Sequence, residues 1–142
     1  ATFSACFGEP FMPMHPGVYA DLLSSKMAEH RSTAWLINTG WSGGSYGVGS
    51  RMKIKYTRAM LNSALDGDLD NVEYVIDERF GFEVPKTCPG VPSEVLIPKK
   101  TWDDSSAYDE TADKLAQMFN QNFERYASGV SSEVNSAAPR VV

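Results

Sequence analysis

The sequence predicts a small α/β domain, because segments with helical periodicity alternate along it with short, strand-forming apolar segments. Three segments carry an apolar side chain every three or four residues, and three shorter ones are rich in β-branched and aromatic residues. The expected order is helix, strand, helix, strand, strand, long loop and helix. This order has too few strands for a complete doubly wound sheet, so we expect part of a mixed sheet flanked by helices. The 142 residues are the length of one domain.

The first helix is expected after a proline-rich segment, residues 10–16, which is irregular because proline lacks an amide hydrogen. Pro16 suits the first turn, and apolar side chains then recur on one helical face up to His30. That face consists of Tyr19, Leu22, Leu23 and Met27. Residues 33–38 follow as an expected short strand, apolar on both faces and therefore covered on both sides.

A second helix is expected to begin near Tyr56 and to end at Gly67, which suits a left-handed cap. Its apolar stripe consists of Tyr56, Met60, Leu61, Ala64 and Leu65. Residues 72–77 and 80–84 combine β-branched and aromatic side chains, with alternation in the second segment. Two further strands are therefore predicted.

Four prolines between residues 85 and 98 predict a long ordered loop without a regular element. Asp103 or Asp104 can cap the third helix, whose apolar spacing is the most regular in the chain. Its stripe contains Tyr108, Ala112, Leu115, Ala116, Phe119, Phe123 and Tyr126. Residues 128–142 show no period, so we expect a flexible tail behind one domain at residues 1–127.

The charge balance is thirteen basic against eighteen acidic residues, a net charge of −5, which predicts no polyanion-binding face and no nucleic-acid partner. No apolar run reaches the ~18–20 residues that span a bilayer, and no signal peptide is visible, so we expect a cytoplasmic protein away from membranes. Cys6 and Cys88 lack a CxxC spacing, which favours two reduced thiols over a disulfide. Without a cluster of ligating side chains, no metal bound by this chain alone is predicted.

A glycine-rich stretch, with five glycines from Gly40 to Gly49, lies between the expected strand 33–38 and the second helix. Such a loop is a common ligand site in α/β proteins, because glycine lets the backbone approach another group closely. It is not a Walker loop, which needs Gly-Lys followed by Ser or Thr, and Met52 stands where the dinucleotide fingerprint has its third glycine. The residues alone leave a structural loop and a ligand loop equally open.

Three side chains beside this loop are candidate ligand contacts. Arg51 follows the loop directly, and its planar guanidinium can bind a phosphate or stack on a base. Thr57 is typical of a helix cap, although a cap hydroxyl can also face a ligand, whereas Lys53 and Lys55 are typical of a solvated face. Trp41 either lines a pocket or packs beneath the loop. No carboxylate pair and no Ser-His-Asp order points to hydrolysis or phosphoryl transfer by this chain alone.

Several separated motifs closely resemble the ATP-dependent phosphoenolpyruvate carboxykinases, in that family's order. They are TFSACFGEPF at 2–11, LINTGWSGG at 36–44, RMKIKYTRA at 51–59, FEVP at 82–85 and CPGVP at 88–92. The resemblance extends to about Ala127. It implies an enzyme that converts oxaloacetate and ATP to phosphoenolpyruvate, ADP and carbon dioxide, the committed step into gluconeogenesis.

The family's chains are several times longer, so the resemblance implies only the C-terminal part of a mononucleotide-binding domain. The chain also lacks a starting Met, which is expected of a processed chain or a piece of a longer one. The resemblance implies that the adenine nucleotide is held by Arg51, Met52 and Thr57. The apolar character of Phe11 alone predicts a place in the core. The resemblance implies instead that Phe11 lines the pocket for the small organic acid. No catalytic residue is expected here, and the ligands for Mg and Mn would lie upstream.

The resemblance implies oxaloacetate, phosphoenolpyruvate and ATP as small-molecule partners, and it leaves a homo-oligomer open. We expect the isolated chain to be inactive, because the phosphate loop, the catalytic lysine and the substrate arginines would also lie upstream. The alternative is a catalytically inactive fragment that acts only as a structural or self-associating module, with apolar strand faces left exposed.

Overall fold

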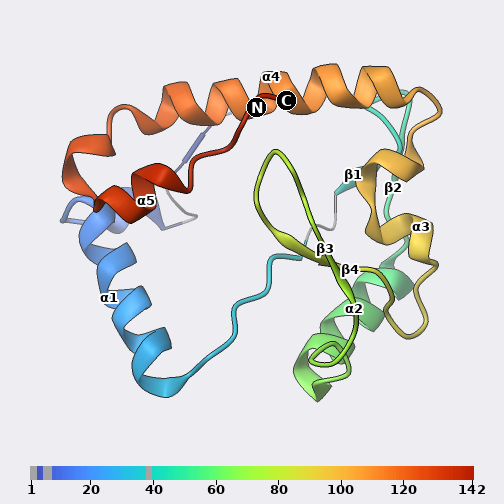
Figure 1. Ribbon diagram of the computed structural model, residues 1–142, viewed down its shortest axis with the longest axis horizontal. Helices are drawn as coiled ribbons and strands as arrows, with labels where there is room; N and C mark the ends of the chain where they lie inside the picture. Colours follow the sequence, from blue (N-terminus) through green and yellow to red (C-terminus); the bar gives the residue numbers. More distant parts are fainter. Residues whose placement is uncertain (1–2, 5–7, 38–39) are drawn as a thin grey trace.

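The computed structural model describes residues 3–4, 8–37 and 40–142 (Figure 1). The elements are η1 (Glu9–Phe11), α1 (Pro16–His30), β1 (Trp41–Ser42), β2 (Ser50–Arg51), α2 (Ile54–Asp66), β3 (Tyr74–Ile76), β4 (Glu83–Pro85), α3 (Ser93–Leu96), η2 (Pro98–Thr101), α4 (Ser105–Phe123), η3 (Ala127–Gly129) and α5 (Ser132–Ser136). This mixture confirms the predicted α/β class. The described strands form two separate antiparallel pairs, β1–β2 and β3–β4, in place of one mixed sheet.

The three long helices are confirmed, and capping explains where two of them begin. At the start of α1, His15 Nδ1 accepts a hydrogen bond from the Gly17 N–H at 3.1 Å. At the start of α4, the Asp104 side chain accepts from the N–H groups of Ser106 and Ala107, so Asp104 is the cap. These side chains satisfy amides that have no partner within the helix.

The left-handed cap at Gly67 is also confirmed. Gly67 ends α2 with φ of +80°, and its N–H donates to the Ser63 carbonyl. Glycine adopts this conformation without the steric cost that a Cβ brings. α2 begins at Ile54, two residues earlier than expected, and the side chain of Lys53 at its N-cap position makes no capping hydrogen bond.

The predicted strand at 33–38 is wrong for its described part. Residues 33–37 have no regular structure, and Asn38 lies outside the described residues. Strand-forming side chains make a strand only where the backbone N–H and C=O groups pair with a neighbour. No described backbone group pairs with residues 33–37, and the Leu36 side chain is 78% exposed.

The strands predicted at 72–77 and 80–84 are confirmed in shorter form as one hairpin. Tyr74 pairs with Pro85, and Ile76 pairs with Glu83. Asp77 shapes the connecting loop, because its Oδ1 accepts from the backbone N–H groups of Arg79 and Phe80 at 3.0 and 2.7 Å. This local hydrogen bonding directs the Arg79 side chain toward α4.

The buried core is small and lies between α2 and the segment that follows β4. Its buried members are Leu69, Cys88, Val91 and Leu96, and Trp35, Tyr56, Ala59, Met60, Ala64 and Val95 pack partly buried against it. The predicted loop 85–98 is therefore only partly irregular, since it contains α3 and a bridge between Cys88 and Val91. Figure 1 shows α1 apart from α2, with the 31–37 connection running between them.

The last residues run back along the molecule and include the short helix α5. The Asn120 side chain donates to the Pro139 carbonyl at 2.9 Å, and the Arg140 N–H donates to the Arg79 carbonyl at 2.7 Å. The flexibility of residues 128–142 and the boundary at 127 stay predictions. None of the helices described here combines the length and apolar character needed to cross a bilayer.

Candidate functional site

The glycine-rich stretch forms the tight loop of the β1–β2 hairpin. In this hairpin Trp41 of β1 pairs with Arg51 of β2. At Gly43, φ is +80° and an added Cβ would lie 2.8 Å from the Thr101 carbonyl oxygen. At Gly49, a Cβ would lie 2.6 Å from the carbonyl oxygen of Ser42. Real Cβ atoms do not approach so closely, so these two glycines are required by the folding of the loop and its contact with η2.

The three residues predicted to contact a nucleotide lie where β2 passes into α2. Arg51 ends β2, is exposed, and makes no ion pair with any described residue. The Met52 N–H is engaged by the Gly40 carbonyl at 3.0 Å, whereas the Met52 carbonyl accepts no hydrogen bond from the described chain. Thr57 is the fourth residue of α2, behind the cap position of Lys53, so the cap interpretation of Thr57 is wrong.

The surface beside Arg51 is strongly basic. The exposed cationic side chains there are Arg51, Lys53, Lys55 and Arg58. Lys53 and Lys55 lie over the Tyr56 ring, with 5.9 and 5.0 Å from Nζ to the ring centroid, which orders their side chains through cation–π attraction. In a chain with a net charge of −5, this local excess of positive charge favours an anionic ligand.

Trp41 lies in β1, at the start of the loop. Its ring meets the Tyr46 ring edge-on, with centroids 5.4 Å apart, and Trp41 remains 45% exposed. The loop residue Tyr46 therefore covers part of Trp41, and the rest of the indole is accessible to a ligand or to solvent. Arg51 pairs with Trp41 across the two strands, so a fluorescent side chain stands beside the candidate site.

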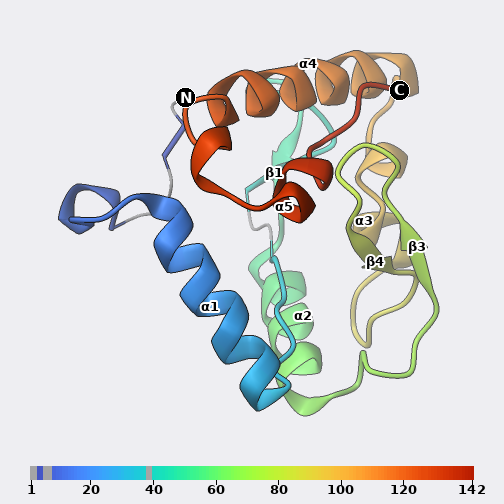
Figure 2. The same cartoon turned by 60° about the vertical axis from the view of Figure 1, so that its left-hand side comes forward.

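The structure does not bring the predicted organic-acid contact to this hairpin. Phe11 ends η1 and is 86% exposed, so its predicted place in the core is wrong. The segment around η1 lies beside the start of α1, away from β1 and β2 in both ribbon views (Figures 1 and 2). The assignment of Phe11 to a substrate pocket stays a prediction.

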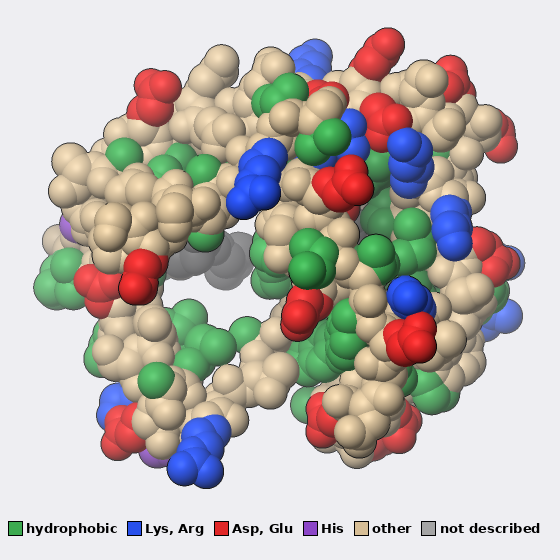
Figure 3. Space-filling model, in the orientation of Figure 1, with side chains coloured by type: hydrophobic (Ala, Val, Ile, Leu, Met, Phe, Trp, Pro, Cys, Tyr) green, Lys and Arg blue, Asp and Glu red, His purple; other side chains and the backbone are tan. Residues whose placement is uncertain are grey.

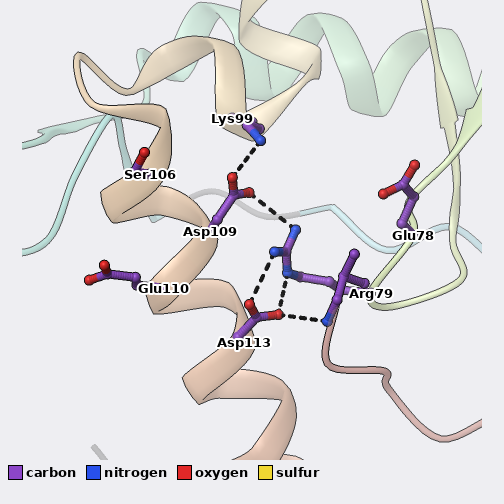
Figure 4. A pocket seen from close by; sticks show the side chains of 8 residues that line it. Glu78, Arg79, Lys99, Ser106, Asp109, Glu110 and Asp113 are labelled. Carbon is purple, nitrogen blue, oxygen red and sulfur yellow. Dashed lines mark hydrogen bonds and ion pairs between the residues drawn. The ribbon is translucent and has the colours of Figure 1, made fainter.

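A second polar cluster, centred on Arg79, was not predicted from the sequence (Figure 4). The guanidinium donates from Nε to Asp113 Oδ1 at 2.7 Å and from Nη2 to Asp113 Oδ2 at 3.2 Å. Its Nη1 lies 3.2 Å from Asp109 Oδ1, and Lys99 Nζ donates to Asp109 Oδ2 at 2.6 Å. Asp109 and Asp113 are four residues apart on α4 and point toward Arg79, a spacing that could have indicated the pair.

This Arg79 cluster is a structural ion-pair network rather than a reactive site. It lines a hollow of about 380 Å³, but both carboxylates that face Arg79 are engaged by cationic groups. The Arg79 guanidinium lowers the pKa of Asp113 below its ordinary value, and the Val142 N–H lowers it further. The hydrogen bond to Asp113 raises the pKa of Arg79 despite its burial. Carboxylates held in this way are poor general bases.

The described residues supply neither a metal site nor an exposed thiol. No group of three His, Cys, Asp or Glu among them could hold a metal ion. Cys88 is a free thiol buried in the core, as expected, with Sγ 3.8 Å from the Pro89 carbonyl oxygen. Cys6 lies outside the described residues, so its predicted reduced state stays a prediction.

The chain is similar to phosphoenolpyruvate carboxykinases along almost its whole length. The family model described as phosphoenolpyruvate carboxykinase matches residues 1–94. A phosphoenolpyruvate carboxykinase (ATP) from Thermus thermophilus is 58% identical over 140 residues, which are 99% of this chain and 26% of that protein. The protein of the same name from Geotalea uraniireducens is 58% identical over 134 residues, 94% of this chain and 25% of that protein. This chain therefore spans about a quarter of the length of these relatives.

The Arg79 cluster predicts a specific dependence of stability on pH. Because the folded-state pKa of Asp113 is lowered, the ionised carboxylate stabilises the fold above its ordinary pKa of 3.8, and this contribution is lost as pH falls through the lower folded-state value. Asp113→Asn should therefore reduce stability at pH 7, and its deficit should shrink below about pH 4. Urea unfolding followed by circular dichroism between pH 3 and 7 measures both effects.

The matched control is Asp21→Asn, which removes a carboxylate from the exposed face of α1 that has no ion pair with a described residue. It should change the pH dependence of stability little. An Asp113→Asn variant whose deficit stays constant from pH 3 to 7 would show that ionisation of Asp113 does not stabilise the fold.

Proposed function

The chain belongs to the phosphoenolpyruvate carboxykinase family, in its ATP-dependent class, and we propose that it supplies the adenine side of the ATP pocket of such an enzyme. The proposed reaction of the whole enzyme converts oxaloacetate and ATP to phosphoenolpyruvate, ADP and carbon dioxide. One observation carries the proposal for this chain. The exposed Arg51, which forms no ion pair with a described residue, lies beside the Met52 carbonyl, which accepts no hydrogen bond from the described chain, at the start of α2.

Each of the three residues has a chemical role that suits an adenine nucleotide. The planar Arg51 guanidinium can stack on the base or direct its charge to the ribose-phosphate. The Met52 N–H is already engaged, so the Met52 carbonyl is the group left to accept a hydrogen bond from the adenine amino group. The Thr57 hydroxyl makes no hydrogen bond with a described residue and can donate or accept one.

The metal ions of the proposed whole enzyme, Mg and Mn, are not expected to bind this chain. The described residues offer no group of ligands that fits a metal ion, and the carboxylates of the Arg79 cluster are engaged by Arg79 and Lys99. We propose that the metal ligands and the loop that holds the ATP phosphates belong to a part of the enzyme outside this chain.

ATP binding by the isolated chain tests the nucleotide site. We expect saturable quenching or enhancement of tryptophan fluorescence on titration with ATP, since Trp41 pairs with Arg51 across the hairpin. Arg51→Ala should weaken binding about tenfold or more, because it removes a charge-assisted contact of about 1.5–3 kcal/mol. Lys114→Ala, which removes an exposed positive charge from α4, is the control and should bind like the parent chain.

Two results would contradict the assignment of Arg51. In one, Arg51→Ala and Lys114→Ala weaken ATP binding equally, which would indicate only non-specific attraction to positive charge. In the other, the parent chain shows no change in fluorescence and no heat of binding by calorimetry up to millimolar ATP. The adenine pocket would then need residues from outside this chain.

Activity of the isolated chain provides a separate prediction. We expect no carbon dioxide release or phosphoenolpyruvate formation from oxaloacetate and ATP, because electrostatic stabilisation of the transferring phosphoryl group needs metals and cationic side chains placed around it. The assay follows phosphoenolpyruvate with Mg and Mn present, and the Thermus thermophilus relative serves as the positive control. Turnover that depends on oxaloacetate would disprove the expected inactivity.

The second candidate function is a self-associating module without enzymatic activity. It is favoured by the exposed apolar side chains of α1, among them Leu22 and Leu23. If this function holds, size-exclusion chromatography should show elution that shifts to larger species as concentration rises, and Leu22→Ser with Leu23→Ser should reduce that shift. Leu65→Ser, an exposed leucine on α2, is the matched control. A monomer at all concentrations would contradict self-association.

A further inference from the structure

The β1–β2 hairpin, which ends in Arg51, rests against a second element, η2. The Ser42 hydroxyl of β1 donates a hydrogen bond to the Thr101 hydroxyl of η2 at 3.3 Å, although 59 positions separate the two residues in the sequence. The Gly43 backbone also approaches Thr101, since an added Cβ at Gly43 would lie 2.8 Å from the Thr101 carbonyl oxygen. Thr101 thus contacts two successive residues of the hairpin, one through its side chain and one through its backbone.

The Thr101 hydroxyl is itself held in one orientation. It donates to the Pro98 carbonyl at 2.7 Å. A hydroxyl has a single hydrogen, so this bond leaves the Thr101 oxygen as the acceptor for Ser42. Threonine suits the position, because its β-branched side chain has few χ1 rotamers and is fixed at little entropic cost. The bond to Pro98 therefore prepares Thr101 to receive the hydrogen of Ser42.

η2 is fixed in turn on α4, the longest helix of the described chain. Lys99 Nζ donates to Asp109 Oδ2 at 2.6 Å. Directly after η2, the Trp102 ring meets the Tyr108 ring edge-on, with centroids 5.7 Å apart. Thr101 lies between these two contacts in the sequence, so its position is set by α4 rather than by the hairpin.

The strand register carries this support to Arg51. Ser42 pairs with Ser50, and the neighbouring Trp41 pairs with Arg51. Each strand has two residues, and a two-stranded ribbon of this size is marginally stable unless it packs against another element. An opening lies between α1 and the side of the molecule that carries β1, β2 and α3, so α1 does not supply that packing (Figures 1 and 3). The contact with η2 therefore helps to set the place of Arg51.

We propose that Thr101 is a positioning residue for Arg51. The Thr101 hydroxyl holds β1 against η2, and the pairing of β1 with β2 then holds the Arg51 backbone where its guanidinium meets the adenine nucleotide. Thr101 does not touch the nucleotide itself. A small displacement of a binding group lowers affinity even when the group is intact, because its contacts depend on direction as well as distance. The proposal rests on the proposed function, since it needs Arg51 to bind ATP.

ATP titration of the 142-residue chain, followed by tryptophan fluorescence and calorimetry, tests this role. Thr101→Val keeps the shape of the side chain and removes the hydroxyl, so it should weaken ATP binding about three- to tenfold, the equivalent of one net hydrogen bond. Thr101→Ser restores the hydroxyl and should bind within about twofold of the parent chain. In the Arg51→Ala background, Thr101→Val should change binding by less than about twofold, because the group that it positions is gone.

The matched control is Thr111→Val, which removes a threonine hydroxyl that donates to the Ala107 carbonyl within α4 at 2.8 Å. It should bind ATP like the parent chain. Ser42→Ala tests the same contact from the hairpin side and leaves the bond between Thr101 and Pro98 in place. It should weaken binding as Thr101→Val does, and it provides the test if Thr101→Val fails to fold by circular dichroism.

Three results would overturn the proposal. If Thr101→Val and Ser42→Ala bind ATP like Thr111→Val while Arg51→Ala binds weakly, the nucleotide site stands and Thr101 does not position it. If Thr101→Val weakens binding equally with and without Arg51, Thr101 supports the fold as a whole. If Arg51→Ala binds no more weakly than Lys114→Ala, the proposed function fails and the role of Thr101 fails with it. That last result needs no Thr101 variant, so the two failures are distinguishable.

Discussion

The Arg79 guanidinium connects parts of the chain that share little buried apolar surface. It projects from the β3–β4 loop, binds two carboxylates on α4, and stands beside Lys99 of η2 through their common partner Asp109. The Arg79 side chain is only 11% exposed, so its charge is removed from much of the solvent and needs these carboxylates. Asp113 also accepts a hydrogen bond from the Val142 N–H, which joins the last residue to the Arg79 cluster.

This constraint explains why α4 stays in place although few of its residues are buried. Ala112 and Ala116 are its only buried residues among those described, and small side chains contribute little apolar area. Bidentate pairing fixes the direction of a guanidinium as well as its distance, so Arg79 sets the position of the hairpin along the helix. The basic side chains near Arg51 serve no such purpose, because none of them forms an ion pair with the described chain.

The features that the sequence predicts well are those that depend on neighbouring residues. The apolar period of α4, its Asp104 cap and the left-handed Gly67 are local, so they could be predicted without knowledge of the fold. The Arg79 cluster could not, because Arg79 and Asp113 are thirty-four residues apart and only tertiary structure brings them together. The proposed nucleotide contacts of Arg51, Met52 and Thr57 are implied by family resemblance alone, and the structure adds which of their groups have no partner among the described residues.

The β1–β2 hairpin and residues 33–37 differ in how much backbone pairing each has within the described chain. The hairpin is closed by its own pairing and by η2, where Ser42 donates to the Thr101 hydroxyl at 3.3 Å. Its glycines fit close contacts that are all present in the chain. Residues 33–37 differ from it, because their side chains favour a strand but no described backbone group pairs with them. The hairpin is therefore held in place by residues of this chain, which fixes the position of Arg51 beside Trp41.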